Sequence, residues 1–318
     1  MPVTLAQARL NVQDDLQMGV IDEFAKSSYL FNNLTFDDCV SPTGGGATLT
    51  YGYTRLITQP TAAFRAVNQE YQAQEVNKQR FTTDLKVFGG SFNIDRVIAN
   101  MGGIISEVTL QMQQKIKAAA ALFNHTVING DNGVDPNEFD GLDKALVGSS
   151  TEMIPAAPLV LDTSTNVTAN WQAFLDVLDE FLMSLDGTPS FIGGNTKLIA
   201  KIRAVARRAG MYQVTKNDFG QQIEQYGNVP LIDFGAQPGS NNPVVPINVG
   251  TGETSLYAAR LGLDGFHAVS MAGVPPVQSW LPDYKTAGAV KTGEVEMVAA
   301  VVLKATKAAG VLRRIKVQ

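Results

Sequence analysis

The longest helical pattern in the chain covers residues 105–130. Apolar side chains recur there at intervals of three and four, which places them on one face of a helix. Ser106 can cap the start, and Gly130 lies where a helix end favours a residue with positive φ. The pattern predicts one helix of about seven turns at 3.6 residues per turn. Its apolar positions are Val108, Met112, Ile116, Ala119, Phe123 and Val127.

Two further helices are predicted among short apolar strands. Residues 171–185 place large apolar side chains on one helical face, with Asn170 as the cap and Gly187 after the end. Residues 195–210 form a basic helix whose charged face is either solvated, the commoner case, or a contact surface for nucleic acid or an acidic partner. Helices and strands alternate here, which favours a mixed α/β layer. The predicted strands are 190–194, 228–234, 253–262, 265–271 and two pieces within 294–317 that are broken at 307–310.

The segments 48–58 and 76–97 are rich in Thr, Tyr, Phe and Val in partial alternation, which predicts two strands. A polar stretch joins them, so the two strands should form a projecting hairpin. A hairpin alone is marginally stable in water. We therefore expect it to lie on another part of the protein or on a neighbouring subunit.

The first 47 residues are acidic and end in the glycine-rich sequence SPTGGG. Asp14 or Asp15 can cap a short helix that extends to about residue 31. We expect an extended arm with one short helix. The segment has no basic stretch followed by an apolar run, so no secretory signal is expected. The apolar run 297–303 is far shorter than the ~18 residues of a membrane span, so no membrane partner is expected either.

Composition places the chain among folded globular proteins, since 45% of its 318 residues are hydrophobic and 17% are charged. Its formal net charge of -5 argues against tight nucleic-acid binding, which requires clustered Lys and Arg. Any contact with DNA should be weak and non-specific. Cys39 is the single cysteine, which excludes an intrachain disulfide and indicates a reducing cytoplasm.

The acidic stretch NGDNGVDPNEFDGL at 129–142 has the carboxylate density of a calcium loop. A calcium loop starting at Asp131 would need Asp or Asn third, Gly sixth and Glu twelfth. The chain has Gly133, Pro136 and Leu142 at those positions. We therefore predict an acidic turn at the exit of the long helix, with its carboxylates facing solvent or a neighbouring subunit.

No catalytic, metal-binding or cofactor-binding residue is predicted. His125 and His267 are the only histidines, and neither HExxH, CxxC nor G-x-S-x-G occurs. The glycine-rich NVGTGETS at 248–255 lacks the lysine of a phosphate-binding loop and is interpreted as a turn. What remains is a chain with large interaction surfaces and no catalytic groups, which indicates assembly.

Five stretches, in this order, resemble the major capsid proteins of tailed bacteriophages, which have the HK97-type fold. Together they span most of residues 48–318. They are ING with the acidic loop and EFDGL (128–142), SFIGGNTK (190–197), DFGQQIEQYGNVPLI (218–232), SLYAARLGLDGFHAV (255–269) and VVLKATKAAGVLRRI (301–315).

The resemblance implies an α+β protein with the HK97-like capsid fold. The long helix would be the spine of a peripheral domain, and an α/β axial domain would follow it. The implied segments are an N-terminal arm (1–47), an extended hairpin loop (48–90), the peripheral domain (91–150), the axial domain (151–267) and return strands that complete both sheets (268–318).

The implied function is that of a major capsid (head) protein without enzymatic activity. Copies would assemble into pentamers and hexamers of an icosahedral shell around double-stranded DNA, in the cytoplasm of a bacterial host. A separate scaffolding protein, a portal and decoration proteins are possible partners. One alternative is an encapsulin, a compartment shell of the same fold that holds cargo protein. A second is an α/β enzyme that binds a phosphate ligand through residues 248–255.

Charge suggests how the arm and the hairpin contact neighbouring subunits. The arm is acidic, whereas 48–88 carries five basic residues against three acidic ones. We hypothesise that opposite charges help to place arms and hairpins between subunits. The candidate interface residues are Arg55, Arg65, Lys78 and Arg80 of the hairpin, Asp14 and Asp15 of the arm, and Asp131 and Asp135 of the acidic loop.

Overall fold

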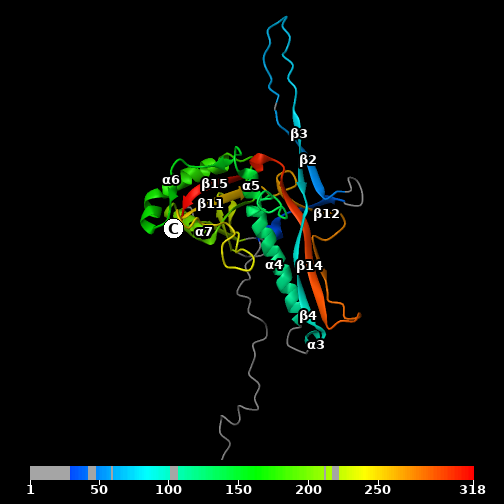
Figure 1. Ribbon diagram of the computed structural model, residues 1–318. Coiled ribbons are helices and arrows are strands. Elements are labelled where there is room, and N and C mark those ends of the chain that lie inside the picture. Colours follow the sequence, from blue (N-terminus) through cyan, green and yellow to red (C-terminus); the bar gives the residue numbers. More distant parts are fainter. Residues whose placement is uncertain (1–28, 42–47, 59, 101–106, 211–212, 217–221) are drawn as a thin grey trace, which may run out of the picture.

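The computed structural model describes residues 29–41, 48–58, 60–100, 107–210, 213–216 and 222–318. Most of the predicted arm, including Asp14 and Asp15, and the predicted helix cap Ser106 lie outside these residues. The described chain builds two large sheets and one projecting hairpin (Figure 1), so the predicted α+β class is confirmed.

The first large sheet, here called the elongated sheet, has β14 at its centre and helix α4 along one side (Figure 1). β4 pairs antiparallel with one edge of β14, while β13 and β12 pair with its other edge. β1 then adds to β12 in parallel. The elements are β1 (Phe36–Val40), β4 (Lys86–Asp95), α4 (Glu107–Asn129), β12 (Phe266–Met271), β13 (Val277–Trp280) and β14 (Val290–Leu303).

β14 changes character along its length. From Val290 to Met297 its exposed and buried residues mostly alternate, because α4 covers one face and the other face is open. From Met297 to Leu303 every residue is buried, since both faces are covered there. Val295, Phe92, Ile94 and Met112 form the small core under α4.

The second large sheet, here called the helix-covered sheet, is buried on both faces along its central strands. In β11, Leu256 and Ala258 pack with the helices α6 and α7, while Tyr257 and Ala259 face the elongated sheet. Its elements are β5 (Glu152–Met153), β6 (Leu159–Val160), α6 (Ser164–Met183), β7 (Phe191–Gly194), α7 (Thr196–Arg208), β8 (Gln213–Lys216), β9 (Gln222–Tyr226), β10 (Val229–Asp233), β11 (Glu253–Ala259) and β15 (Ala309–Lys316).

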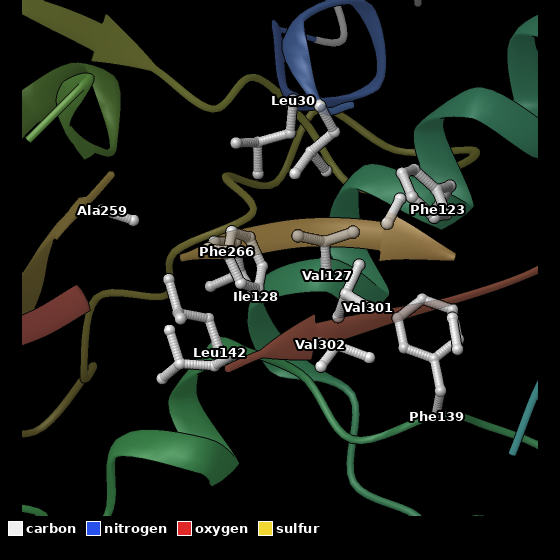
Figure 2. Packing of buried hydrophobic residues seen from close by; sticks show 14 of the residues in the cluster. Leu30, Phe123, Val127, Ile128, Phe139, Leu142, Ala259, Phe266, Val301 and Val302 are labelled. Atoms are coloured by element: carbon white, nitrogen blue, oxygen red, sulfur yellow. The ribbon is translucent and has the colours of Figure 1, made fainter. Parts of the chain in front are cut away.

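A shared core joins the two sheets where α4 ends. Figure 2 shows Phe123, Val127 and Ile128 of α4 beside Val301 and Val302 of β14. The short helices α5 (Leu142–Leu146) and η1 (Thr306–Ala308) border this core. The two sheets therefore form one continuous body.

The predicted hairpin is present and leaves this body (Figure 1). β2 (Thr50–Leu56) pairs antiparallel with β3 (Lys78–Asp84) as a separate two-stranded sheet. The buried Leu85 separates β3 from β4. Residues 86–90, which the implied boundaries assign to the hairpin, pair with β14 and so belong to the elongated sheet.

The described end of the predicted arm is also part of the body. α2 (Tyr29–Asn33) places Leu30 in the core with no exposed surface, and Leu34 is 6% exposed. β1 pairs with β12, because Phe36 and Asp37 oppose Ala268 and Val269. Residues 29–40 of the predicted arm therefore pack on the body, and the boundary of the arm at residue 47 stays a prediction.

The helices predicted at 105–130, 171–185 and 195–210 are confirmed, with two corrections, whereas the helix predicted within the arm lies mostly outside the described residues. α6 begins seven residues before the expected start, and its cap is Thr163, whose hydroxyl accepts from Asn166 N; Asn170 lies inside the helix and donates to Val160 O. Gly130 does not have positive φ. It is glycine because a Cβ there would come within 2.3 Å of Phe139 O.

Candidate assembly surfaces

The hairpin carries the largest group of exposed apolar side chains in the described chain. Phe64 is fully exposed, Val67 is 86% exposed and Tyr71 is 64% exposed. Apolar groups gathered on a projection indicate an interaction surface. Sequence reasoning missed them, because it took this stretch as a polar link although three large apolar residues occur within eight positions. The full set is Leu56, Ile57, Phe64, Val67, Tyr71 and Val76.

Arg65 holds the tip of the hairpin in shape. Its guanidinium donates to Ala66 O at 3.3 Å and to Gln69 O at 3.2 Å, and it lies 5.3 Å from the ring centroid of Tyr71. Such a cation–π contact at an exposed position is worth about 0.5–1 kcal/mol. Arg65 therefore helps to present Tyr71 while its own charge remains at the surface.

Arg55, also predicted as an interface residue, anchors the hairpin to its own subunit. Its side chain donates to Leu303 O and, at 2.6 Å, to Lys304 O, at the end of β14. The guanidinium lies 4.6 Å from the ring centroid of Phe81 on β3. Tyr53 Oη donates to Leu303 O at 3.2 Å. These contacts connect the hairpin root to the carbonyls of the last residue of β14 and of the residue after it.

Lys78 and Arg80 lie on one face of β3, because they are two residues apart in a strand. Both are exposed. The Arg80 guanidinium crosses Gly52 of the paired strand, where a Cβ would lie 3.1 Å from Nη2. The four basic candidates are therefore spread from root to tip of the hairpin and do not form one patch.

The acidic loop after α4 uses its carboxylates locally. Asp131 pairs with Lys144 at 3.0 Å and accepts from Gly133 N at 2.8 Å, and these contacts, the lysine first, lower the pKa of Asp131. Asp135 accepts from Asn137 N at 2.9 Å. No group of three metal-ligating side chains occurs among the residues that the structure describes. The predicted exit turn is present, and an interface role for Asp131 and Asp135 stays a prediction.

The glycine-rich turn at 248–255 has little capacity for phosphate. The Asn248 side-chain oxygen accepts from Gly250 N at 2.9 Å and Thr251 N at 3.2 Å, and Glu253 N donates to Thr251 Oγ1. These amides are the donors that a phosphate-binding loop would offer to its ligand. The predicted turn is confirmed, and the phosphate-enzyme alternative loses its main support.

An open pocket of about 530 Å³ lies beside this turn, at the start of α7. The only ionisable side chain in its lining is Lys197, which donates to Gln318. Asn195 at the pocket floor is 1% exposed, and its amide is satisfied by Leu198 N, Thr254 Oγ1 and Val245 O. The lining offers no pair of groups that could transfer protons.

None of the helices described here is long and apolar enough to cross a membrane.

The chain matches known proteins in structure only. No protein-family profile matches it, and no curated protein sequence matches it. It is similar to the holo-SrpI encapsulin of Synechococcus elongatus PCC 7942, with a TM-score of 0.68, 16% identity and coverage of 99% of this chain and 97% of that chain.

Two further structures match over nearly the full length of this chain. The capsid of an empty GTA particle has a TM-score of 0.65 and 13% identity, covering 98% of both chains. A chain of Gordonia phage Cozz has a TM-score of 0.58 and 13% identity, covering 98% of this chain and 93% of that chain. The chain therefore has the HK97-type capsid fold, as its sequence resemblance implied.

Proposed function

We propose that this chain is the major capsid protein of a tailed bacteriophage, a structural subunit without enzymatic activity. Copies form pentamers and hexamers of an icosahedral shell that encloses double-stranded DNA. The shell assembles in the cytoplasm of the bacterial host, with scaffolding, portal and decoration proteins as candidate partners. The observation that carries the proposal is the agreement in fold over nearly the full length of this chain and of several shell proteins.

The hairpin supports the shell-forming part of the proposal. Its six exposed apolar residues gain nothing in an isolated subunit, whereas burial against a neighbour stabilises by roughly 25 cal/mol per Å² of apolar surface. We assign these residues to contacts with an adjacent copy of the chain. Because every copy both offers a hairpin and receives one, such contacts are head-to-tail and can close into rings.

The net charge of -5 agrees with packaging and not with tight DNA binding. A shell that encloses DNA must let the nucleic acid enter and leave, so weak contact with phosphates suits it better than a basic lining. The charge hypothesis for arms and hairpins remains part of the proposal. In its favour, Lys78 and Arg80 are exposed on one face of β3, where their charges are open to a neighbouring subunit.

An encapsulin-like compartment is the second candidate. It is favoured by the TM-score of 0.68 with an encapsulin, which exceeds the scores of 0.65 and 0.58 with the two other shells reported above. Both candidates share self-assembly and differ in what the shell holds. The content of the particle therefore separates them.

Electron microscopy of the purified, assembled protein tests the proposal. We expect closed icosahedral particles that contain nuclease-resistant double-stranded DNA when they are produced in infected or induced host cells. Particles that hold a cargo protein and no DNA would favour the encapsulin function. A chain that stays monomeric or dimeric under all assembly conditions would contradict both functions.

A further inference from the structure

His267, on β12, is the most enclosed ionisable side chain of the elongated sheet. It has no exposed surface, and neither ring nitrogen makes a hydrogen bond of good geometry to a residue that the structure describes, although the Gly265 backbone lies beside the ring. Buried polar groups of native proteins are nearly always hydrogen-bonded. An imidazole that lacks such partners indicates a position where the neutral ring is needed for packing and where a charge would be costly.

One carboxylate oxygen, Asp37 Oδ2, lies near His267, Lys304 and Tyr51 at the same time. Asp37 Oδ2 lies 3.9 Å from His267 Nε2 and 4.0 Å from Lys304 Nζ, and it accepts a hydrogen bond from Tyr51 Oη at 3.1 Å. The Tyr51 ring meets the imidazole edge-on, with 6.0 Å between centroids. Lys304 Nζ lies 5.4 Å from the centroid of the Tyr51 ring.

These four residues come from four parts of the fold that meet at the hairpin root. Asp37 belongs to β1, Tyr51 to β2, His267 to β12, and Lys304 follows the end of β14. Tyr51 is 8% exposed, so its ring and hydroxyl fasten β2 to the sheet from inside. Tyr51 and Arg55 lie on the same face of β2, so the cluster continues the Arg55 contacts along that face.

The surroundings favour neutral His267. Burial and the nearby Lys304 ammonium outweigh Asp37 and the Gly265 carbonyl, and they lower the pKa of His267 to about 4 from an ordinary value of 6.5. The other titratable or charged groups around the cluster are Cys39 on β1, Tyr53 and Arg55 on β2, and Asp264 before β12.

We propose that His267 is a pH-sensitive latch, which holds the root of the β2–β3 hairpin on the elongated sheet while it is neutral and loosens that root when it is protonated. A protonated ring needs an acceptor, and the nearest carboxylate is the one that Tyr51 uses. Either the ring takes Asp37 from Tyr51, or the cluster opens to water. Both outcomes weaken the attachment of β2 to β1.

The loosening is local. Arg55 donates to the backbone carbonyls of Leu303 and Lys304, and these contacts do not involve His267, so this part of the root stays attached. Acid therefore frees the segment around Tyr51 without detaching the whole hairpin. The proposal concerns a single subunit and does not depend on the contents of any shell.

Hydrogen exchange measured by mass spectrometry on the full chain tests the latch. We compare pH 7 with pH 4.5, after correction for intrinsic exchange rates, in peptides that cover 36–40 and 49–54. In the native chain we expect exchange at these peptides to be at least tenfold faster at pH 4.5, with peptides of β11 unchanged.

Variants of the two histidines provide matched comparisons. His267→Gln keeps a neutral polar side chain that cannot be protonated, so the acid-induced change should disappear. His125→Gln removes the other histidine, which lies on α4, and should behave like the native chain. Equal acceleration in His267→Gln and in the native chain, or no acceleration in the native chain, would overturn the proposal.

Lys304→Gln gives an independent measurement that does not depend on the folding of the His267 variant. Removal of the ammonium removes a charge that opposes protonation of His267. The pH at which the root loosens should therefore rise by a measurable amount in an exchange series from pH 7 to pH 4. An unchanged midpoint would contradict the assignment of the latch to His267.

Discussion

The two large sheets differ in how they bury their side chains. The helix-covered sheet is enclosed on both faces, by α6 and α7 on one side and by the shared core on the other. In the elongated sheet, β4 and the first half of β14 bury one face only, and the hairpin beyond them buries almost nothing. The first region buries its apolar side chains within the subunit, whereas the second leaves apolar surface exposed for contact with other molecules.

The residue patterns explain the difference. β11 has one continuous buried run from Leu256 to Ala259, which requires cover on both faces. β4 alternates along its ten residues, which requires cover on one face only. β3 has no buried residue. Stability should therefore depend on the helix-covered sheet, and association on the hairpin.

The largest expected effect comes from a cavity in the helix-covered sheet. Phe181 on α6 has no exposed surface and lies against Gly310, where a Cβ would come within 2.8 Å of its ring. Phe181→Ala should lower the free energy of unfolding by about 3–5 kcal/mol, measured by urea denaturation. Met183→Ala on the same helix is the control: Met183 is 87% exposed, so its change should stay within about 0.5 kcal/mol. Equal losses of unfolding free energy in the two variants would contradict the inference that stability depends on the core of the helix-covered sheet.

A smaller effect should separate the two regions in acid. The pKa of His267 is about 4 in the folded chain and 6.5 when unfolded, so the unfolded state binds more protons between these values. Stability of the elongated sheet is then full above pH 6.5, falls with pH, and is lower by about 2 kcal/mol at pH 5. In the helix-covered sheet, hydrogen bonds from Gly148 N and Arg313 outweigh burial and lower the pKa of Glu152. The stabilisation that ionised Glu152 provides is therefore lost only below about pH 4.5, the ordinary pKa of this carboxyl group.

The two tryptophans can report on the two regions separately. Trp171 lies on α6 and Trp280 on β13. In Trp171→Phe the remaining Trp280 should show a lower urea midpoint at pH 5 than at pH 7.5. In Trp280→Phe the remaining Trp171 should shift less. Identical shifts at both positions would mean that the sheets unfold as one unit and lose stability together.

The smallest effect on stability is expected at the hairpin tip. Phe64→Ser combined with Val67→Ser should change the free energy of unfolding by less than about 0.5 kcal/mol, because both side chains are already exposed. Assembly into particles, measured by sedimentation, should nevertheless fall sharply. Gln72→Ser, an exposed polar position of the same loop, is the matched control and should assemble normally. Normal assembly of the double variant would show that the tip makes no contact between copies.

Local signals were sufficient for much of the fold. Periodicity predicted α4, and the basic helix predicted over residues 195–210 is α7, within two residues of its ends. The early start of α6 was not predicted, because its first turns are polar and are held by Thr163 and by packing of Val167 against strands far away in sequence. Tertiary contacts here override the local pattern.

The sequence predicted which segments carry the candidate surfaces, but not which contacts their residues make. Charge composition identified Arg55, yet its partners at Leu303 and Lys304 lie about 250 residues later and turn it into an internal anchor. Asp37 and His267 are 230 positions apart and share no motif, so only the pairing of β1 with β12 brings them together. The pairing of strands that are far apart in the chain cannot be inferred from the spacing of residues along it.

The hairpin tip also has a consequence for how the chain changes over generations. Residues 60–76 touch only one another among the described contacts, so no core residue restricts what replaces them. Folding alone exerts no selection on Phe64, Val67 or Tyr71; a docking surface would. Lineages of this protein should therefore vary the tip together with the surface that receives it, and two diverged lineages should fail to form mixed particles long before their cores become incompatible.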